Sequence, residues 1–147
     1  MGIWDRLRRR EAELGSAAIA VVGAGYVGTG VVHSIGQSPG MHPAVVVNRN
    51  TDRSIAALTA MGVRANEIVV SDQVEVLAEA IRNGSPAVTD DAGVLTELPI
   101  DVVVEATGAL DYGTETILAV LGAGKHVVSF NAEVDALLGW RLSLIHI

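Results

Sequence analysis

The spacing of apolar residues changes near residue 17 of this chain. Before it, Ile3, Leu7 and Leu14 recur among charged residues, which predicts a short amphipathic helix over Ile3–Leu14 that ends near Gly15. The alternative is that this segment is a solvated N-terminal leader without a specific function. After residue 17, short β-branched runs alternate with stretches of helical periodicity, which indicates βαβ units.

Five apolar runs have the length of strands and are nearly continuous. They are Ala18–Val22, Ala44–Asn48, Ala87–Thr89, Asp101–Ala106 and His126–Phe130. The helical stretches between them are Tyr26–Ile35, Thr51–Met61, Asp72–Asn83 and Gly113–Gly122. Continuous apolar strands are typical of a parallel sheet with helices on both faces. The pattern therefore predicts an α/β fold, a doubly wound and mostly parallel Rossmann-type sheet in a single domain.

The predicted organisation is an N-terminal helix over residues 1–16 and a nucleotide-binding domain over residues 17–141. At 147 residues, half of them apolar, the chain has the size of one domain with a sizeable core. Residues 64–86 are a longer stretch than a simple crossover needs. We expect an inserted strand and helix there, or one extra helix that covers the sheet.

The last six residues read as a translated DNA adapter. The mosaic-end adapter of transposase-based library preparation, CTGTCTCTTATACACATC, encodes the sequence of residues 142–147. We therefore expect these residues to be non-native and the natural sequence to be reliable to about Arg141. A strand of a following domain is the alternative, since Leu and Ile are ordinary strand residues.

Composition and charge narrow the choice of ligands. A net charge of −7, with two Trp, two Tyr and one Phe, argues against nucleic-acid binding, which needs basic residues and stacking surfaces. Cysteine is absent and the four histidines lack ligand spacing, so we expect no metal site. No apolar run is long enough to span a membrane, and cytoplasm is the expected compartment. A small anionic ligand remains compatible, because backbone amides and one arginine can hold it.

The sharpest motif is the glycine-rich run Gly23-Ala24-Gly25-Tyr26-Val27-Gly28, between the first predicted strand and its helix. In such a turn Gly23 permits the tight bend, Gly25 lets the backbone approach a pyrophosphate, and Gly28 lets the helix lie close to the sheet. The amides of Tyr26, Val27 and Gly28 are candidate phosphate ligands at the positive end of that helix. Because glycine-rich turns also serve packing alone, the strand and helix around the motif support dinucleotide binding.

The second predicted strand ends in Asn48 and Arg49, about twenty residues beyond Gly28, where NAD-binding domains carry a ribose-binding acid. Asn48 can still hydrogen-bond a ribose oxygen. Arg49 suits a 2′-phosphate, which an aspartate would repel. We therefore expect NADP to be preferred over NAD, unless Arg49 simply faces solvent.

A turn of small residues, Ala106-Thr107-Gly108, follows the fourth predicted strand at the carboxyl edge, where ligands of parallel sheets lie. These residues leave room for a nicotinamide ribose, and the Thr107 hydroxyl could hydrogen-bond it. A purely structural turn is the alternative. The next strand delivers Ser129 and Asn131 to the same edge.

Three motifs together resemble homoserine dehydrogenase. They are Gly23-Ala24-Gly25 with Gly28, Val104-Glu105-Ala106-Thr107-Gly108, and Gly124-Lys125-His126-Val127-Val128 with Asn131. In this order and spacing the chain is similar to the amino-terminal NAD(P)-binding domain of that family, from about Trp4 to Trp140. It is most similar to the group called predicted homoserine dehydrogenases with a carboxy-terminal SAF-type domain.

The resemblance implies a two-domain oxidoreductase in which this part binds NADP or NAD. A missing part would then convert a small hydroxy or carbonyl substrate. The resemblance also implies pyrophosphate contacts for the glycine-rich turn, ribose and nicotinamide contacts for Ala106, Thr107 and Gly108, and a place for Asn131 at the same edge. The family's lysine after that asparagine is Ala132 here, which argues against homoserine itself as the substrate.

No catalytic residue is assigned. Glu105, Glu133 and Asp135 lie near the expected active edge, but simpler explanations are available. We expect Glu105, at a strand end, to hydrogen-bond nearby backbone, and Glu133 and Asp135 to cap a helix that begins near Val134. Two hypotheses on function remain: a truncated oxidoreductase and a stand-alone NADP-binding sensor or regulatory module. In the first case the chain alone should bind cofactor weakly and catalyse nothing, and the intact protein could be a homo-oligomer.

Overall fold

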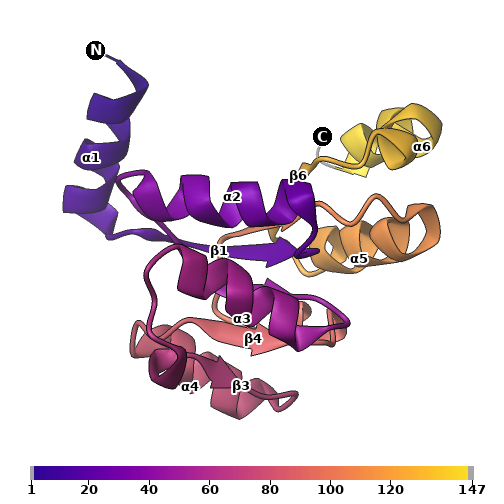
Figure 1. The fold of residues 1–147 in the computed structure, drawn as a ribbon. Coiled ribbons are helices and arrows are strands. Elements are labelled where there is room, and N and C mark those ends of the chain that lie inside the picture. Colours follow the sequence, from indigo (N-terminus) through magenta and orange to yellow (C-terminus); the bar gives the residue numbers. More distant parts are fainter. Residues whose placement is uncertain (1, 146–147) are drawn as a thin grey trace.

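Six strands form one parallel sheet in residues 2–145, the part of the chain that the computed structural model describes (Figure 1). The strand order is β3-β4-β2-β1-β5-β6, and each of the five pairings is parallel. The strands are β1 Ala17–Val22, β2 Met41–Val47, β3 Val69–Val70, β4 Ala87–Thr89, β5 Val102–Glu105 and β6 His126–Ser129. The predicted doubly wound α/β fold is confirmed.

Helices cover both faces of this sheet. They are α1 Ile3–Leu14, α2 Tyr26–Gln37, α3 Thr51–Ala60, α4 Val74–Arg82, α5 Leu110–Gly122 and α6 Ala132–Ile145, with short 3-10 helices η1 Ala65–Glu67 and η2 Gly93–Thr96. The N-terminal helix has the predicted bounds, and none of its residues is buried.

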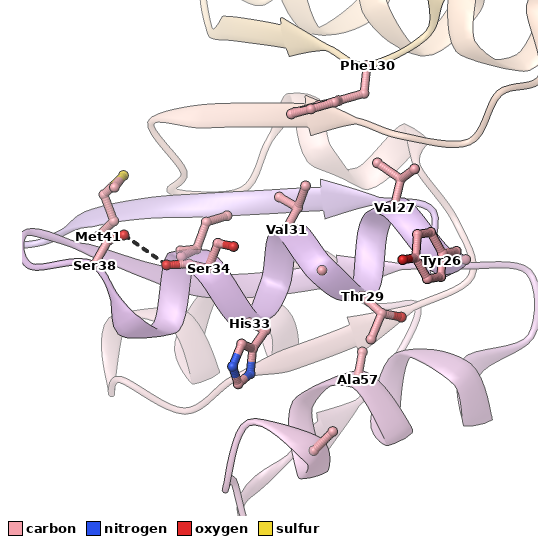
Figure 2. A pocket seen from close by; sticks show the side chains of 14 residues that line it. Tyr26, Val27, Thr29, Val31, His33, Ser34, Ser38, Met41, Ala57 and Phe130 are labelled. Carbon is pink, nitrogen blue, oxygen red and sulfur yellow. Dashed lines mark hydrogen bonds between the residues drawn. The ribbon is translucent and has the colours of Figure 1, made fainter.

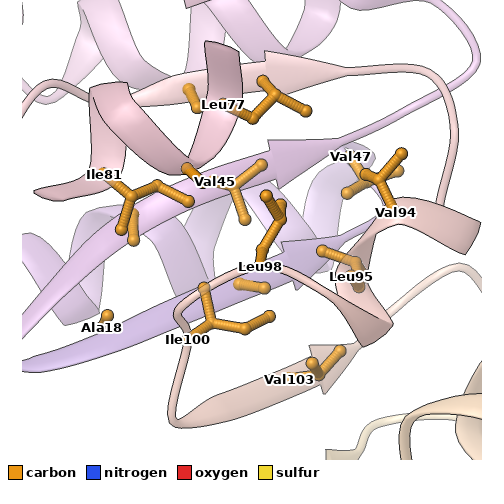
Figure 3. Close-up of a cluster of buried hydrophobic side chains, with 14 of the residues drawn as sticks. Ala18, Val45, Val47, Leu77, Ile81, Val94, Leu95, Leu98, Ile100 and Val103 are labelled. Carbon is orange, nitrogen blue, oxygen red and sulfur yellow. The ribbon is translucent and has the colours of Figure 1, made fainter. Parts of the chain in front are cut away.

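The central strand β1 divides the core into two halves. All six of its residues are buried, as expected for a strand covered on both faces. Alternate residues of β1 pack against α2 and α3 on one face and against α4, η2 and α5 on the other. Figure 3 shows the second half, where Leu77 and Ile81 of α4 lie over the sheet together with Val94 and Leu95 of η2.

The long stretch after α3 is an inserted strand and helix, the first of the two predicted possibilities. It contains η1, β3 and α4, and β3 pairs with β4 to form one edge of the sheet. At the other edge, β6 pairs with β5, and three of its four residues are exposed.

Several element boundaries differ from the prediction by one or two residues, and the two larger differences have a physical reason. Helix α5 begins at Leu110 rather than Gly113, because Gly113 is not a helix breaker here but a buried position within α5. Strand β2 begins at Met41, ahead of Ala44. It accommodates Pro43 where its register with β1 shifts, as is typical of proline inside a sheet.

The C-terminal helix α6 continues through Ile145, so residues 142–145 are helical rather than a strand of a following domain. The non-native origin of residues 142–147 stays a prediction, and His146 and Ile147 lie outside the described residues. Between residues 2 and 145, no helix is long and apolar enough to cross a membrane. The same part of the chain has no group of three His, Asp or Glu side chains placed to hold a metal ion.

Candidate functional site

A cavity of about 300 Å³ opens at the carboxyl edge of the sheet, where β1, β2 and β5 end side by side. The ends of these strands are joined through their backbones, with Gly23 N–H donating to Val47 O and Ala106 N–H donating to Val22 O, both at 2.8 Å. The cavity is lined by Val22, Gly23, Gly25, Val47, Asn48, Arg49, Arg53, Ala106, Thr107, Ala109 and Tyr112. Ligands of open parallel sheets bind at this edge.

The three glycines of the turn after β1 each meet a different constraint. Gly23 has a φ of 98°, which favours glycine, and a Cβ there would lie 3.0 Å from the backbone of Ala106. A Cβ on Gly28 would overlap the carbonyl oxygen of Gly23 and lie 2.8 Å from its carbon. Gly28 is therefore required by the turn itself, more than by the sheet as the sequence suggested. Gly25 has no heavy atom within 4 Å of a Cβ position, so the space beside it is open to a ligand.

Helix α2 begins beside this open space, and its N-terminus has no side-chain cap. The N-cap is Gly25, and no side-chain hydrogen bond caps the helix within residues 2–145. The first backbone bond of the helix runs from Thr29 N–H to Gly25 O at 2.9 Å. Uncapped amides at a helix N-terminus, beside a glycine turn, form an anion-binding site, and they fit a pyrophosphate.

Asn48 ties the end of β2 to the glycine-rich turn. Its Oδ1 accepts from Ala24 N–H at 3.1 Å, and its Nδ2 donates to Asn50 O at 2.8 Å. One acceptor position and one N–H of the amide are still available to a ligand. Asn48 thus lines the cavity, as predicted, and also fixes the shape of the turn.

Two arginines lie at the end of the cavity beside β2. Arg49 was predicted, whereas Arg53, in the first turn of α3, was not. A basic residue in the first turn of a helix opposes the helix dipole, and this signal in the sequence could have identified Arg53. The half-buried ring of Tyr112 from α5 also lines the cavity, and burial raises the pKa of Tyr112, with the charge of Asp91 adding to the shift and that of Arg49 opposing it.

The turn after β5 is held by a buried carboxylate. Glu105 is fully buried, and its Oε1 accepts from the Thr107 N–H at 2.8 Å and from the Thr107 hydroxyl. The Thr107 Oγ1 in turn accepts from Ala109 N–H at 3.2 Å. The turn lines the cavity through Ala106 and Thr107, while Gly108, with a φ of 67°, lies outside the lining.

Asn131 is placed as a cap rather than at the cavity wall. It is 1% exposed, its Oδ1 accepts from Val134 N–H at 3.2 Å, and its Nδ2 donates to Ala109 O at 3.2 Å. It therefore joins the start of α6 to the turn after β5. Glu133 and Asp135 occupy the first turn of α6, where acidic residues favour the helix dipole.

A second, larger hollow of about 990 Å³ follows the outer side of α2 (Figure 2). Figure 2 shows Val27 and Val31 of α2 on this side, with Phe130 across from them. Tyr26 lies at its end beside Gly25 and is 98% exposed. The hollow is mainly apolar, whereas the smaller cavity carries Gly23, the two arginines and Asn48, so the smaller one is the candidate cofactor site.

The structure brings six of the predicted site residues together in one cavity. Those six are Gly23, Gly25, Asn48, Arg49, Ala106 and Thr107. Tyr26 and Val27 line the hollow along α2, and Gly28, Gly108 and Asn131 shape the surrounding turns. Sequence reasoning missed Arg53, Ala109 and Tyr112, because α3 and α5 bring them to the edge from outside the motifs.

Comparison with known proteins identifies the family of this chain. The family described as homoserine dehydrogenase, NAD binding domain, matches residues 23–142. A homoserine dehydrogenase of Methylobacillus glycogenes is 34% identical over 73 residues, which are 49% of this chain and 18% of that protein.

Solved structures of dehydrogenases share the fold. The homoserine dehydrogenase of Thiobacillus denitrificans has a TM-score of 0.59 and 23% identity, over 88% of this chain and 27% of that chain. The scyllo-inositol dehydrogenase of Lactobacillus casei, solved with NAD(H) and scyllo-inositol, has a TM-score of 0.57 and 19% identity, over 78% and 27%. A 3-ketoreductase of Actinomadura kijaniata, solved with TDP-benzene and NADP, has a TM-score of 0.59 and 19% identity, over 88% and 35%. The chain spans well under half the length of each of these proteins.

Proposed function

The chain belongs to the family of homoserine dehydrogenase NAD-binding domains, and from this premise we propose that its cavity binds NADP in preference to NAD, for an oxidoreductase that converts a small hydroxy or carbonyl compound. The observation that carries the cofactor proposal is the pair of arginines, Arg49 and Arg53, at the end of a cavity that opens beside Gly25. The alternative of a stand-alone sensor is not favoured, since the related proteins described above are dehydrogenases.

The proposed roles follow the geometry of the cavity. Gly25 and the amides of Tyr26, Val27 and Gly28 receive the pyrophosphate, because the space beside Gly25 is open and the helix end is uncapped. Ala106 and Thr107 form the wall toward the nicotinamide ribose, with Gly108 shaping their turn. The bound cofactor supplies the hydride chemistry, while the protein binds and orients it.

The proposed NADP preference rests on charge. The usual ribose-binding acid is replaced by Asn48, and both arginines can reach a 2′-phosphate at the same end of the cavity. A hydrogen bond between an arginine and a phosphate contributes about 1.5 to 3 kcal/mol, or roughly ten- to a hundredfold in affinity.

The test is a titration of the chain with NADPH and with NADH, followed by cofactor fluorescence. We expect Arg49→Ala and Arg53→Ala each to weaken NADPH binding by roughly tenfold to a hundredfold and to leave NADH binding unchanged. Arg82→Ala, at an exposed arginine near the end of α4, is the matched control and should change neither. Equal affinity for both cofactors in the unmodified chain would contradict the NADP preference, and binding of neither would contradict the proposed function.

The substrate proposal concerns the parent protein, because the chain spans well under half the length of its relatives. Ala132, at the start of α6, stands where the resemblance places a lysine, and we therefore propose a small hydroxy or carbonyl compound other than homoserine. The measurement is cofactor turnover by the full-length parent against a panel of small hydroxy acids and alcohols. Turnover with homoserine at a rate typical of metabolic enzymes would contradict this proposal.

A further inference from the structure

The buried side chain of Glu105 is not explained by packing. It is the last residue of β5 and is 0% exposed, and the sheet places it next to Val22 on one side and Ser129 on the other. Burying a carboxylate costs several kcal/mol unless hydrogen bonds replace its lost hydration. The hydrogen bonds that Glu105 accepts therefore indicate its role.

The Glu105 carboxylate accepts two hydrogen bonds, and both come from Thr107. The Thr107 N–H donates to Glu105 Oε1 at 2.8 Å, and the Thr107 hydroxyl donates to the same oxygen. A hydroxyl has one donor and two acceptor positions, and an ionised carboxylate only accepts. The single O–H of Thr107 is therefore directed at Glu105 and is not available to a ligand.

The acceptor positions of the Thr107 oxygen are divided between protein and cavity. One accepts from Ala109 N–H at 3.2 Å, which leaves one position for a ligand. Because Thr107 lines the cavity, it faces the ligand as a hydrogen-bond acceptor only. A group that donates, such as a hydroxyl, can bind there, whereas a phosphate oxygen cannot.

Helix α5 passes close to the Glu105 carboxylate at Gly113. A Cβ on Gly113 would lie 3.0 Å from Glu105 Oε2 and 2.7 Å from Asn131 Nδ2, so the helix passes this close only because residue 113 is glycine. Among the described residues, Oε2 has no hydrogen-bond partner, and both bonds from the turn fall on Oε1. The carboxylate therefore holds the turn after β5 in one orientation.

We propose that Glu105 is a positioning residue of the cofactor site, which acts through Thr107 and makes the Thr107 oxygen an acceptor for a donor group of the nicotinamide dinucleotide. The inference rests on the proposed function, since it assumes that this cavity binds such a cofactor. Two groups of the nicotinamide half have the required chemistry, the ribose hydroxyls and the carboxamide NH2. A phosphate is excluded from the position beside the Thr107 oxygen. The proposed partners of the phosphates are the amides at the start of α2.

The experiment is a calorimetric titration of NADPH into the chain and its variants. We expect Glu105→Met, which cannot accept, to weaken binding by about fivefold to tenfold, and Glu105→Gln, whose Oε1 can accept both bonds from Thr107, to rescue binding to within about twofold. Thr107→Val should weaken binding to a similar extent, and the double variant Glu105→Met with Thr107→Val should be no weaker than either alone, because the two residues act as one unit. Glu115→Met, at an exposed glutamate on α5, is the control and should bind as the unmodified chain does.

Two cofactor analogues identify the donor without any change to Glu105. A dinucleotide whose nicotinamide ribose lacks hydroxyls tests the ribose, and the 3-acetylpyridine analogue, which has a methyl group in place of NH2, tests the carboxamide. One of the two analogues should bind the unmodified chain about fivefold more weakly than the normal cofactor does. The same analogue should bind the Thr107→Val variant as tightly as the normal cofactor does. If each analogue loses the same affinity in the unmodified chain as in the Thr107→Val variant, the acceptor role of Thr107 is wrong.

Amide exchange reports on the turn in the absence of cofactor. The amides of Thr107 and Ala109 should exchange faster in Glu105→Met and at the original rate in Glu105→Gln. If the unmodified chain binds no nicotinamide cofactor, the proposed function fails and this inference fails with it. If it binds cofactor and Glu105→Met binds equally well, or Glu105→Gln is as weak as Glu105→Met, only this inference is overturned.

Discussion

The two turns that line the cofactor cavity are built in opposite ways. The turn after β1 is made of backbone, with glycines where side chains would collide and a helix end that offers amides. The turn after β5 is made of side chains, with Glu105 holding Thr107 and Asn131 holding Ala109. They touch where Gly23 passes Ala106. In the proposed binding mode, the first turn matches a charged group with fixed geometry, the pyrophosphate, and the second turn matches a neutral polar group.

This difference predicts different responses to mutation. In the backbone turn, a single added methyl group meets main chain that cannot move aside, so the effect is on folding or on ligand space. In the side-chain turn, groups can shift, and a conservative replacement can restore a lost hydrogen bond. The following substitutions test this contrast, from the largest expected effect to the smallest.

Gly28→Ala should have the largest effect, because its Cβ would overlap the Gly23 carbonyl oxygen at the centre of the backbone turn. We expect a loss of about 3 kcal/mol or more in the free energy of unfolding, measured by urea denaturation. Gly30→Ala is the control in the same helix. Its Cβ meets nothing within 4 Å, and alanine there should raise stability by about 0.5 to 1 kcal/mol. A Gly28→Ala chain as stable as the control would refute the rigidity of this turn.

Gly113→Ala should have the next largest effect and tests the side-chain turn. The added Cβ meets Asn131 Nδ2 and the Glu105 carboxylate, which can move only by giving up hydrogen bonds to the turn. We expect a loss of about 1 to 3 kcal/mol in stability together with weaker cofactor binding. Gly122→Ala, at the end of the same helix in open space, is the control and should not destabilise the chain. Equal stability of the two variants would show that the turn adapts freely.

Gly25→Ala should separate ligand binding from folding. Because nothing lies within 4 Å of its Cβ position and its φ of −82° suits alanine, stability should stay the same or rise by up to about 1 kcal/mol. The methyl group would occupy space that the pyrophosphate needs, so affinity for NADPH should fall by about tenfold to a hundredfold. The pair of measurements is thermal unfolding and cofactor titration. Unchanged affinity would place the pyrophosphate elsewhere.

Asn48→Ala should have the smallest effect, because it removes one link between the turn and β2. The Ala24 N–H and Asn50 O would lose partners, which costs about 1 kcal/mol of stability. Asn48→Asp keeps the acceptor for Ala24 and adds a negative charge, so it should move the preference from NADPH toward NADH. Comparing the two variants by cofactor titration separates the hydrogen bond from the charge. An unchanged preference in the Asn48→Asp variant would contradict the proposed position of the 2′-phosphate.

The backbone turn could be predicted from sequence, and so could most of the sheet. Its glycines are local signals, and the apolar runs of β1 and β5 mark strands buried on both faces. The bend, the helix start and the position of Arg49 follow from spacing alone, because each depends on neighbours in the chain.

The side-chain turn could be located but not explained. The motif from Glu105 to Gly108 was identified, and Glu105 was expected to hydrogen-bond nearby backbone, as it does with the Thr107 N–H. The residue pattern did not indicate the second bond, from the Thr107 hydroxyl, or the close approach of Gly113 to the carboxylate. Those contacts depend on how α5 crosses β5, which is tertiary structure. For the same reason Gly113 was interpreted as the start of a helix instead of a close contact inside one, and Arg53 and Tyr112 were missed.

The edge strand β6 has a practical consequence for handling this chain. Its outer side has no strand partner among residues 2–145, and Val128 and the adjoining Phe130 are about half exposed. An open, apolar strand edge is a template for pairing with another molecule. We therefore expect concentrated samples to aggregate through this edge, and the substitution Val128→Lys to keep them monodisperse in light scattering.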